Sequence, residues 1–162
     1  MNAPWKESKL ILPQNLEEKV RELRESGQTI ATLNGSFDLM HAGHLYMIHE
    51  ASQQADCLIL ALNTDASIKK YKSPERPLIN LEYRLQMAAA LQFVDFVTYF
   101  DETDPCEFLK KVQPDIHVNG SEYGRECIEA KVIKEYGGKL HIVRLMPGLS
   151  TSNLIEKIKS CV

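Results

Sequence analysis

The sequence predicts an α/β protein with an open, mostly parallel sheet of five strands and helices on both faces, folded as a single Rossmann-like domain. Short apolar runs alternate with stretches of helical periodicity, which is typical of parallel sheets. The run at residues 57–62 is apolar without interruption, as expected for a strand buried on both faces. The predicted strands are residues 30–33, 57–62, 93–100, 115–118 and 140–145.

Size and composition are those of an ordinary globular domain. The chain has 162 residues, of which 44% are hydrophobic and 25% charged. A net charge of −3 gives no general electrostatic reason to bind nucleic acid or an anionic membrane. The 4 cysteines are scattered, with no C-x-x-C pair, which favours reduced thiols and a cytoplasmic protein. Neither a signal peptide nor an apolar run long enough to span a membrane is recognisable.

Residues 1–28 are predicted to be an N-terminal arm and helix that precede the main domain, residues 29–162. Residues 1–13 hold two prolines and little periodicity, so they are expected to be an arm and not a packed element. A helix follows, with Asn15 as its N-cap and Glu18 at the third helical position.

The most informative stretch runs from residue 32 to residue 55. It is predicted to be a strand, a glycine turn and a helix, with His41 and His44 on either side of Gly43 at the helix start. Residues three apart share a helix face, so both imidazoles point the same way. Free backbone N–H groups and the helix dipole attract anions there, and Gly43 has no Cβ to hold a phosphate away.

Less specific roles are open for these histidines. Either ring alone is typical of a solvated or capping residue, and a pair at this spacing also suits zinc. No nearby cysteine or acidic residue completes a metal site. The two histidines together, directly after a strand, favour phosphate chemistry.

Further polar segments follow the predicted strands. Residues 63–65 and 119–123 come directly after strands, at the edge where open α/β sheets bind ligands, and residues 150–153 begin the last helix. Helix capping is the alternative explanation for Thr64, Asp65 and the hydroxyl run.

The loop at residues 69–80 is rich in lysine, arginine and proline. Such a run is usually solvated, but its position also suits a lid in which Lys72 or Arg76 neutralises phosphate charge. Asn80 is expected to cap the next helix, in which Arg84 faces either ligand or solvent. Further along, residues 104–107 are expected to start a helix with Asp104 as its N-cap.

The segment from Gly35 to His44, GSFDLMHAGH, resembles the G-x-F-D-x-x-H-x-G-H signature of the cytidylyltransferase-like nucleotidyltransferases. This resemblance implies transfer of a nucleoside monophosphate from a nucleoside triphosphate to a phosphorylated acceptor, with release of pyrophosphate. It extends over nearly the whole chain and is similar to the D-glycero-D-manno-heptose 1-phosphate adenylyltransferase branch. The activity implied is formation of ADP-heptose from ATP, with Mg²⁺ bound to the triphosphate.

The resemblance also implies roles for individual residues. His41, His44 and Lys72 would be catalytic and stabilise charge on the phosphates. The expected nucleotide and phosphate contacts are Gly35, Ser36, Phe37, Gly43, Asn119, Gly120, Ser150, Thr151 and Ser152. Acceptor contacts are expected from Asp38, Asp65 and Arg76, and no protein side chain is expected to hold a metal.

Two departures from the family pattern leave the identities of the acceptor and of the nucleobase undecided. Relatives that act on glycerol phosphate carry an arginine where Leu145 stands, and several heptose enzymes carry a lysine at the position of Asn119. The alternatives are a cytidylyltransferase for glycerol 3-phosphate or another polyol or amino-alcohol phosphate, and a non-catalytic nucleotide-binding module. A homodimer or larger homo-oligomer is also implied, with no nucleic-acid or membrane partner.

Overall fold

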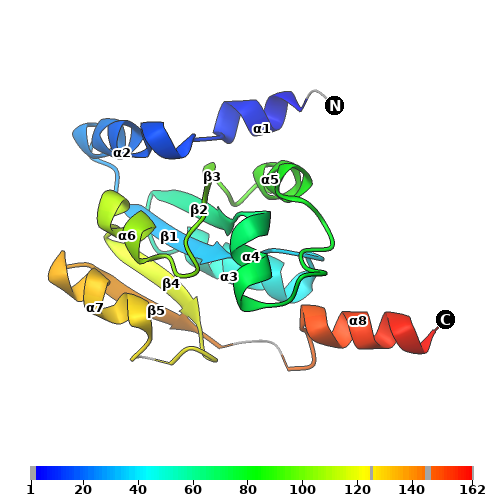
Figure 1. The fold of residues 1–162 in the computed structure, drawn as a ribbon. Helices are drawn as coiled ribbons and strands as arrows, with labels where there is room; N and C mark the ends of the chain where they lie inside the picture. Colours follow the sequence, from blue (N-terminus) through cyan, green and yellow to red (C-terminus); the bar gives the residue numbers. More distant parts are fainter. Residues whose placement is uncertain (1–2, 125, 145–146, 162) are drawn as a thin grey trace.

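In the computed structural model, which describes residues 3–124, 126–144 and 147–161, five parallel strands form one sheet (Figure 1). Their order across the sheet is β3-β2-β1-β4-β5, so the predicted fold class is confirmed. The strands are β1 (Ile30–Gly35), β2 (Cys57–Asn63), β3 (Phe96–Phe100), β4 (Ile116–Gly120) and β5 (Lys139–Val143).

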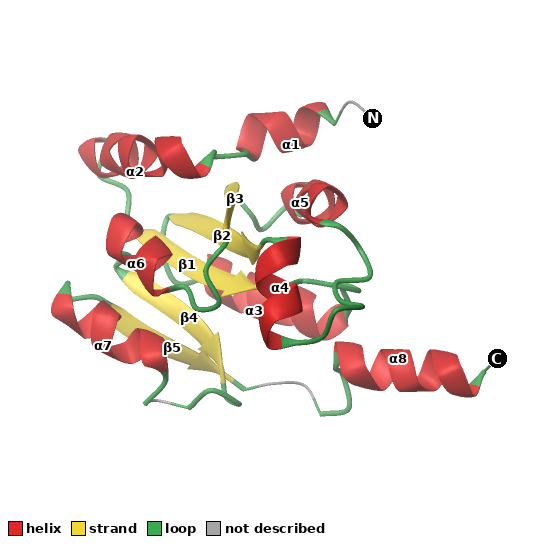
Figure 2. Cartoon of the chain, in the orientation of Figure 1, coloured by secondary structure: helices red, strands yellow, loops and turns green. Residues whose placement is uncertain are grey.

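Helices cover both faces of the sheet (Figure 2). On one face α3 (Ala42–Ser52) and α5 (Leu81–Ala89) pack with apolar side chains such as Leu33 and Leu60. The opposite face is covered by three helices, α2 (Leu16–Glu25), α6 (Cys106–Val112) and α7 (Ile128–Glu135). The remaining helices are α1 (Pro4–Lys9), the short 3₁₀ helix η1 (Pro13–Asn15), α4 (Asp65–Tyr71) and α8 (Thr151–Ser160).

The strand order reverses at β1. Thr32 of β1 is in register with Ile59 of β2 on one side and with His117 of β4 on the other. The chain passes from β1 to β2 and β3, then crosses back to β4. Open α/β sheets bind ligands at the carboxyl ends of strands flanking such a reversal. The ends of β1 and β4 are therefore the expected ligand site.

The prediction of an unpacked arm at residues 1–13 is wrong. Pro4 begins helix α1, a position where proline is favoured because its missing N–H is not needed. The Trp5 indole donates to the Gln86 carbonyl over 3.1 Å, and the Ile11 amide donates to the Val97 carbonyl over 2.8 Å. This segment therefore covers the edge of β3. The division of the chain at residue 28 stays a prediction.

Some predicted boundaries shift. β3 begins at Phe96 and not at residue 93, because residues 91–95 form a turn in which the Asp95 carboxylate accepts from the Leu58 amide. Asn15 is the N-cap of α2 without a side-chain hydrogen bond. Asp104 does accept from the Cys106 amide, but α6 begins one residue later than predicted, with Pro105 as its N-cap. Leu145, assigned to the fifth strand, lies outside the described residues.

A buried histidine makes folding sensitive to acid. The His117 ring is fully buried and its Nδ1 lies 2.9 Å from the Thr32 hydroxyl. Burial lowers the pKa of His117 to about 4. An unfolded histidine has a pKa of about 6.5, so between these values only the unfolded chain binds the proton. The free energy of unfolding is therefore not reduced by His117 above about pH 6.5, and it falls as the pH is lowered toward 4, because the unfolded chain then takes up the proton.

We expect His117→Gln to lose less free energy of unfolding than the wild type when the pH is lowered from about 7.5 to about 5, because glutamine does not titrate. Urea unfolding at each pH measures the difference. His49→Gln, at a half-exposed histidine of α3, is the control and should follow the wild type. Equal losses in His117→Gln and the wild type would contradict the assignment.

Candidate active site

A cavity of about 500 Å³ opens at the carboxyl ends of β1 and β4. Its walls come from the turn after β1, the start of α3, the loop after α4, the end of β4 and the start of α8. The residues predicted to bind nucleotide or catalyse that line it are Gly35, Ser36, Phe37, His41, Gly43, His44, Lys72, Arg76, Asn119, Ser150, Thr151 and Ser152. Segments far apart in the sequence thus meet in one pocket, but residues 63–65, which were predicted at the same edge of the sheet, do not line it.

His41 and His44 present matching hydrogen-bond donors at the start of α3. His41 is the N-cap, and its Nδ1 accepts from the Gly43 amide over 3.1 Å. The Nδ1 of His44 accepts from the His41 amide over 3.2 Å. Each Nδ1 is occupied as an acceptor, so in each neutral ring the hydrogen is on Nε2. The ring centroids are 3.9 Å apart, which places two neutral donors side by side.

Both rings are neutral at physiological pH. Burial lowers the pKa of His44 to about 4, with the charge of a protonated His41 or of Lys72 acting in the same direction. Burial also lowers the pKa of His41. Capping and anion binding were alternatives for these histidines, but the geometry allows both: Nδ1 caps the helix while Nε2–H is left for a ligand.

The turn between β1 and α3 has a strained backbone. Phe37 and Leu39 adopt positive φ angles of 46° and 50°, which non-glycine residues rarely do. A Cβ added at Gly43 would lie 3.0 Å from the His41 ring, so glycine allows the imidazole to fold back over the helix start. Strain of this kind persists where the surroundings over-determine the backbone, and it clusters at functional sites.

Lys72 lines the same pocket as the two histidines. It follows α4 as the C-cap, and its Nζ donates to the Ser36 hydroxyl over 2.9 Å. Burial lowers the pKa of Lys72, and the neighbouring charges of Arg76 and Arg84 lower it further. Lys72 and Arg76 both line the cavity, and positive charge at this wall suits a polyphosphate.

Helix α8 brings a second helix N-terminus to the pocket. Ser150 is its N-cap and accepts from the Asn153 amide over 3.1 Å. The Thr151 hydroxyl donates to the carbonyl of Asp38 over 3.0 Å, which ties α8 to the turn after β1. The starts of α3 and α8 therefore face the same cavity, and both favour anions through free N–H groups and helix dipoles.

The end of β4 carries one acidic side chain into this pocket. Asn119 and Glu122 line the cavity, and Asn119 Oδ1 accepts from the Gly120 amide. Gly120 itself does not line the cavity, contrary to the prediction. A Cβ at Gly120 would overlap the Glu122 carboxylate, so glycine is needed for the glutamate to fold back over the strand end.

Two residues predicted to contact the acceptor lie behind the pocket wall instead. The fully buried carboxylate of Asp38 accepts from Arg76 Nε over 2.7 Å and from the Leu78 and Ile79 amides over 2.9 Å and 3.0 Å. Burial would raise the pKa of Asp38, but these hydrogen bonds hold it below its usual value. Asp65 accepts from Arg84, and neither carboxylate lines the cavity. Direct contact with an acceptor is therefore not supported for either; Arg76 does line the pocket.

Sequence reasoning missed several pocket residues. Asn34, Met47, Ser73, Glu122, Tyr123 and Leu149 also line the cavity. Tyr123 and Glu122 belong to a polar strand end that was recognised as a segment, but nothing in its residue types indicates which side chains turn inward. Arg84, expected to face either ligand or solvent, is fully buried and does not line the cavity.

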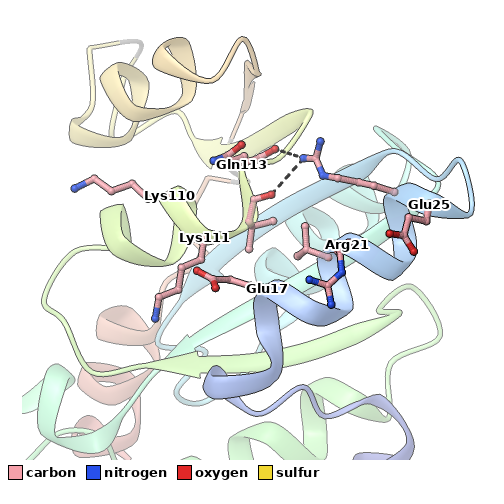
Figure 3. A pocket seen from close by; sticks show the side chains of 9 residues that line it. Glu17, Arg21, Glu25, Lys110, Lys111 and Gln113 are labelled. Atoms are coloured by element: carbon pink, nitrogen blue, oxygen red, sulfur yellow. Dashed lines mark hydrogen bonds between the residues drawn. The ribbon is translucent and has the colours of Figure 1, made fainter.

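A second groove of about 520 Å³ lies between α2 and α6 (Figure 3). Arg24 donates there to the carbonyls of Val112 and Gln113, where α6 ends. Figure 3 shows Glu17, Arg21 and Lys111 around it, so the charges are mixed. The role of these contacts is to hold α2 against α6.

The fold and site define an α/β protein with a cavity where the strand order reverses, lined by two helix starts that favour anions. The cytidylyltransferase-like family model matches residues 32–160. The chain belongs to the cytidylyltransferase-like family of nucleotidyltransferases.

Relatives of known name include bifunctional proteins HldE. The protein from Syntrophotalea carbinolica is 40% identical over 153 residues, which is 94% of this chain and 31% of the relative. The one from Methylobacillus flagellatus is 39% identical over 143 residues, 88% of this chain and 29% of the relative. The chain thus spans about a third of the length of the relatives it matches.

Solved structures agree with the fold. A lipopolysaccharide core biosynthesis protein from Thermoplasma volcanium is 26% identical with a TM-score of 0.60, covering 74% of this chain and 98% of that chain. A pantoate-beta-alanine ligase from Francisella tularensis is 16% identical with a TM-score of 0.61, covering 93% and 79%, and supports the fold alone. Among the described residues no helix is long and apolar enough to cross a membrane.

Proposed function

We propose that this protein transfers AMP from ATP to a sugar 1-phosphate, D-glycero-D-manno-heptose 1-phosphate, and releases pyrophosphate to give ADP-heptose. The observation that carries this proposal is the pair of neutral Nε2–H donors of His41 and His44 at the start of α3, facing Lys72 and the start of α8. Donors fixed in place before reaction stabilise the charge that develops on a phosphoryl group.

In the proposed reaction an oxygen of the acceptor phosphate attacks the α-phosphorus of ATP in line. A new P–O bond forms while the bond to the β-phosphate oxygen breaks, and the electron pair leaves with pyrophosphate. The nucleophile is already ionised near neutral pH, so no strong general base is required. Orientation of the two substrates contributes up to about 7 to 11 kcal/mol to such reactions.

Mg²⁺ would enter with the triphosphate and neutralise part of its charge. Within the described residues no cluster of three or more His, Cys, Asp or Glu side chains could hold a metal ion. The chain's own proposed contribution is the donor set: His41, His44 and Lys72, with the backbone of Gly35 and the hydroxyls of the α8 start.

The heptose acceptor is supported by the relatives. Proteins HldE align over most of this chain, and a structural relative at 26% identity is described as a lipopolysaccharide core biosynthesis protein. Only about a third of each HldE protein is matched, so the proposal is limited to nucleotidyl transfer. We further propose a cytoplasmic enzyme that forms a homodimer or larger homo-oligomer and acts without nucleic acid or membrane.

A second candidate is a cytidylyltransferase acting on glycerol 3-phosphate or another polyol or amino-alcohol phosphate. Asn119 lines the cavity at a position where the resemblance to several heptose enzymes implies a lysine, so the identities of the acceptor and of the nucleobase are what the test must decide. The test is pyrophosphate release from ATP or CTP with each acceptor. We expect turnover with ATP and heptose 1-phosphate and little with CTP and glycerol 3-phosphate; the opposite ranking would establish the second candidate.

The remaining alternative is a nucleotide-binding module without catalysis. Calorimetric titration with ATP, run beside the acceptor screen, distinguishes it. Binding of ATP without pyrophosphate release for any acceptor would overturn the proposed transfer reaction.

A further inference from the structure

Arg84 lies at the centre of a network behind the active-site wall. Its guanidinium is fully buried in α5 and makes three hydrogen bonds to three different segments. Nη1 donates to the Ser36 carbonyl over 2.7 Å, and Nε donates to the Ile79 carbonyl over 2.9 Å. Nη2 donates to the Asp65 carboxylate over 2.6 Å. Arg84 does not line the cavity, so it has no contact with a ligand there.

These contacts link Arg84 to Lys72 by two routes, through α4 and through Ser36. Asp65 is the first residue of α4, and Lys72 is the C-cap of the same helix, about 10 Å further along at 1.5 Å per residue. Lys72 Nζ in turn contacts the Ser36 hydroxyl. Arg84 therefore holds the start of α4 with one nitrogen and the turn that Lys72 contacts with another.

We propose that Arg84 is a positioning residue that sets where the Lys72 ammonium lies relative to His41 and His44 across the pocket. This inference rests on the proposed nucleotidyl transfer. A small displacement of a positioned group reduces catalysis strongly while substrate binding through other contacts is kept. The planar guanidinium suits the task because its donors form a rigid fork, whereas the ammonium of lysine is a single point charge.

The experiment compares Arg84→Lys and Arg84→Met with the wild type. Arg84→Lys keeps the charge beside Asp65 but cannot hold Ser36, Ile79 and Asp65 together. We expect kcat to fall at least about tenfold in both variants, with KM for ATP changed by less than about threefold, because His41, His44 and the α8 start still bind the triphosphate. Arg84→Lys should unfold at a higher temperature than Arg84→Met and yet be no more than slightly more active.

The matched control is Val112→Ala. Val112 is fully buried in α6 on the opposite face of the sheet, so its truncation destabilises the fold without touching the network. Kinetics are measured at a temperature well below the unfolding midpoint of every variant. Val112→Ala should then keep the wild-type kcat, which separates loss of stability from loss of positioning.

The experiment distinguishes failure of the Arg84 positioning role from failure of the proposed nucleotidyl transfer. If the wild type releases no pyrophosphate with any acceptor, nucleotidyl transfer is wrong. If the wild type turns over and a folded Arg84→Lys or Arg84→Met keeps kcat within about twofold, the positioning role is wrong. A loss of kcat in Val112→Ala equal to that in the Arg84 variants would likewise overturn it, because stability alone would then explain the effect.

Discussion

Replacement of His44 by alanine should lower turnover by a factor of about 10² to 10³, the usual loss when one preorganised donor to a developing charge is removed. The neutral ring keeps its hydrogen on Nε2 because Nδ1 accepts from the His41 amide. Alanine removes that donor and also one acceptor of the helix cap, which costs about 1 kcal/mol of stability. Pyrophosphate release with ATP and the acceptor measures turnover, and thermal unfolding shows that the fold is retained.

His49→Ala provides a matched control. His49 lies near the end of the same helix, and its ring packs against Phe93, away from the cavity. We expect wild-type turnover for this variant, because an imidazole is lost without loss of a donor in the pocket. Turnover of His44→Ala within about threefold of the wild type would rule out the proposed role of the Nε2–H group.

The fold class follows from local patterns, but the strand order does not. Alternating apolar runs and helices indicate a parallel sheet because each strand must be buried on both faces. Whether β4 pairs with β3 or crosses to β1 depends on contacts between distant residues, such as Thr32 with His117. The N-terminal segment was misjudged for a related reason. Two prolines and little periodicity predict an arm at residues 1–13, whereas the contacts of this segment with α5 and β3 involve residues distant in the sequence.

That His41 and His44 lie side by side could be predicted because residues three apart share a helix face. Their protonation could not, because it depends on which backbone amides each Nδ1 meets. The acidic residues show the same limit. Contact of Asp38 and Asp65 with the acceptor is what the family resemblance implies, and Asp65 also follows a strand at the ligand edge. Their partners, Arg76 and Arg84, come from later in the chain and turn both carboxylates toward the scaffold.

Asp38→Asn should destabilise the fold by about 3 to 5 kcal/mol, because it breaks a buried ion pair and leaves Arg76 without its partner. Arg76 Nε and the Leu78 amide donate to one carboxylate oxygen and the Ile79 amide to the other, so the NH₂ group of asparagine faces at least one donor in place of an acceptor. The loop that carries Lys72 and Arg76 should therefore detach from the turn after β1. Urea unfolding measures the stability, and limited trypsin digestion should show faster cleavage after Lys72.

The control for Asp38→Asn is Asp56→Asn. Asp56 also accepts from a backbone amide and a side chain, both of Thr29, but it is exposed and lies away from the cavity. We expect wild-type cleavage and turnover for it. If Asp38 instead contacted the acceptor directly, Asp38→Asn would raise KM for the acceptor while the loop stayed protected from trypsin. That combination would contradict the anchoring role, because a loop held by the bonds of Asp38 to Arg76, Leu78 and Ile79 should lose its protection when those bonds are weakened.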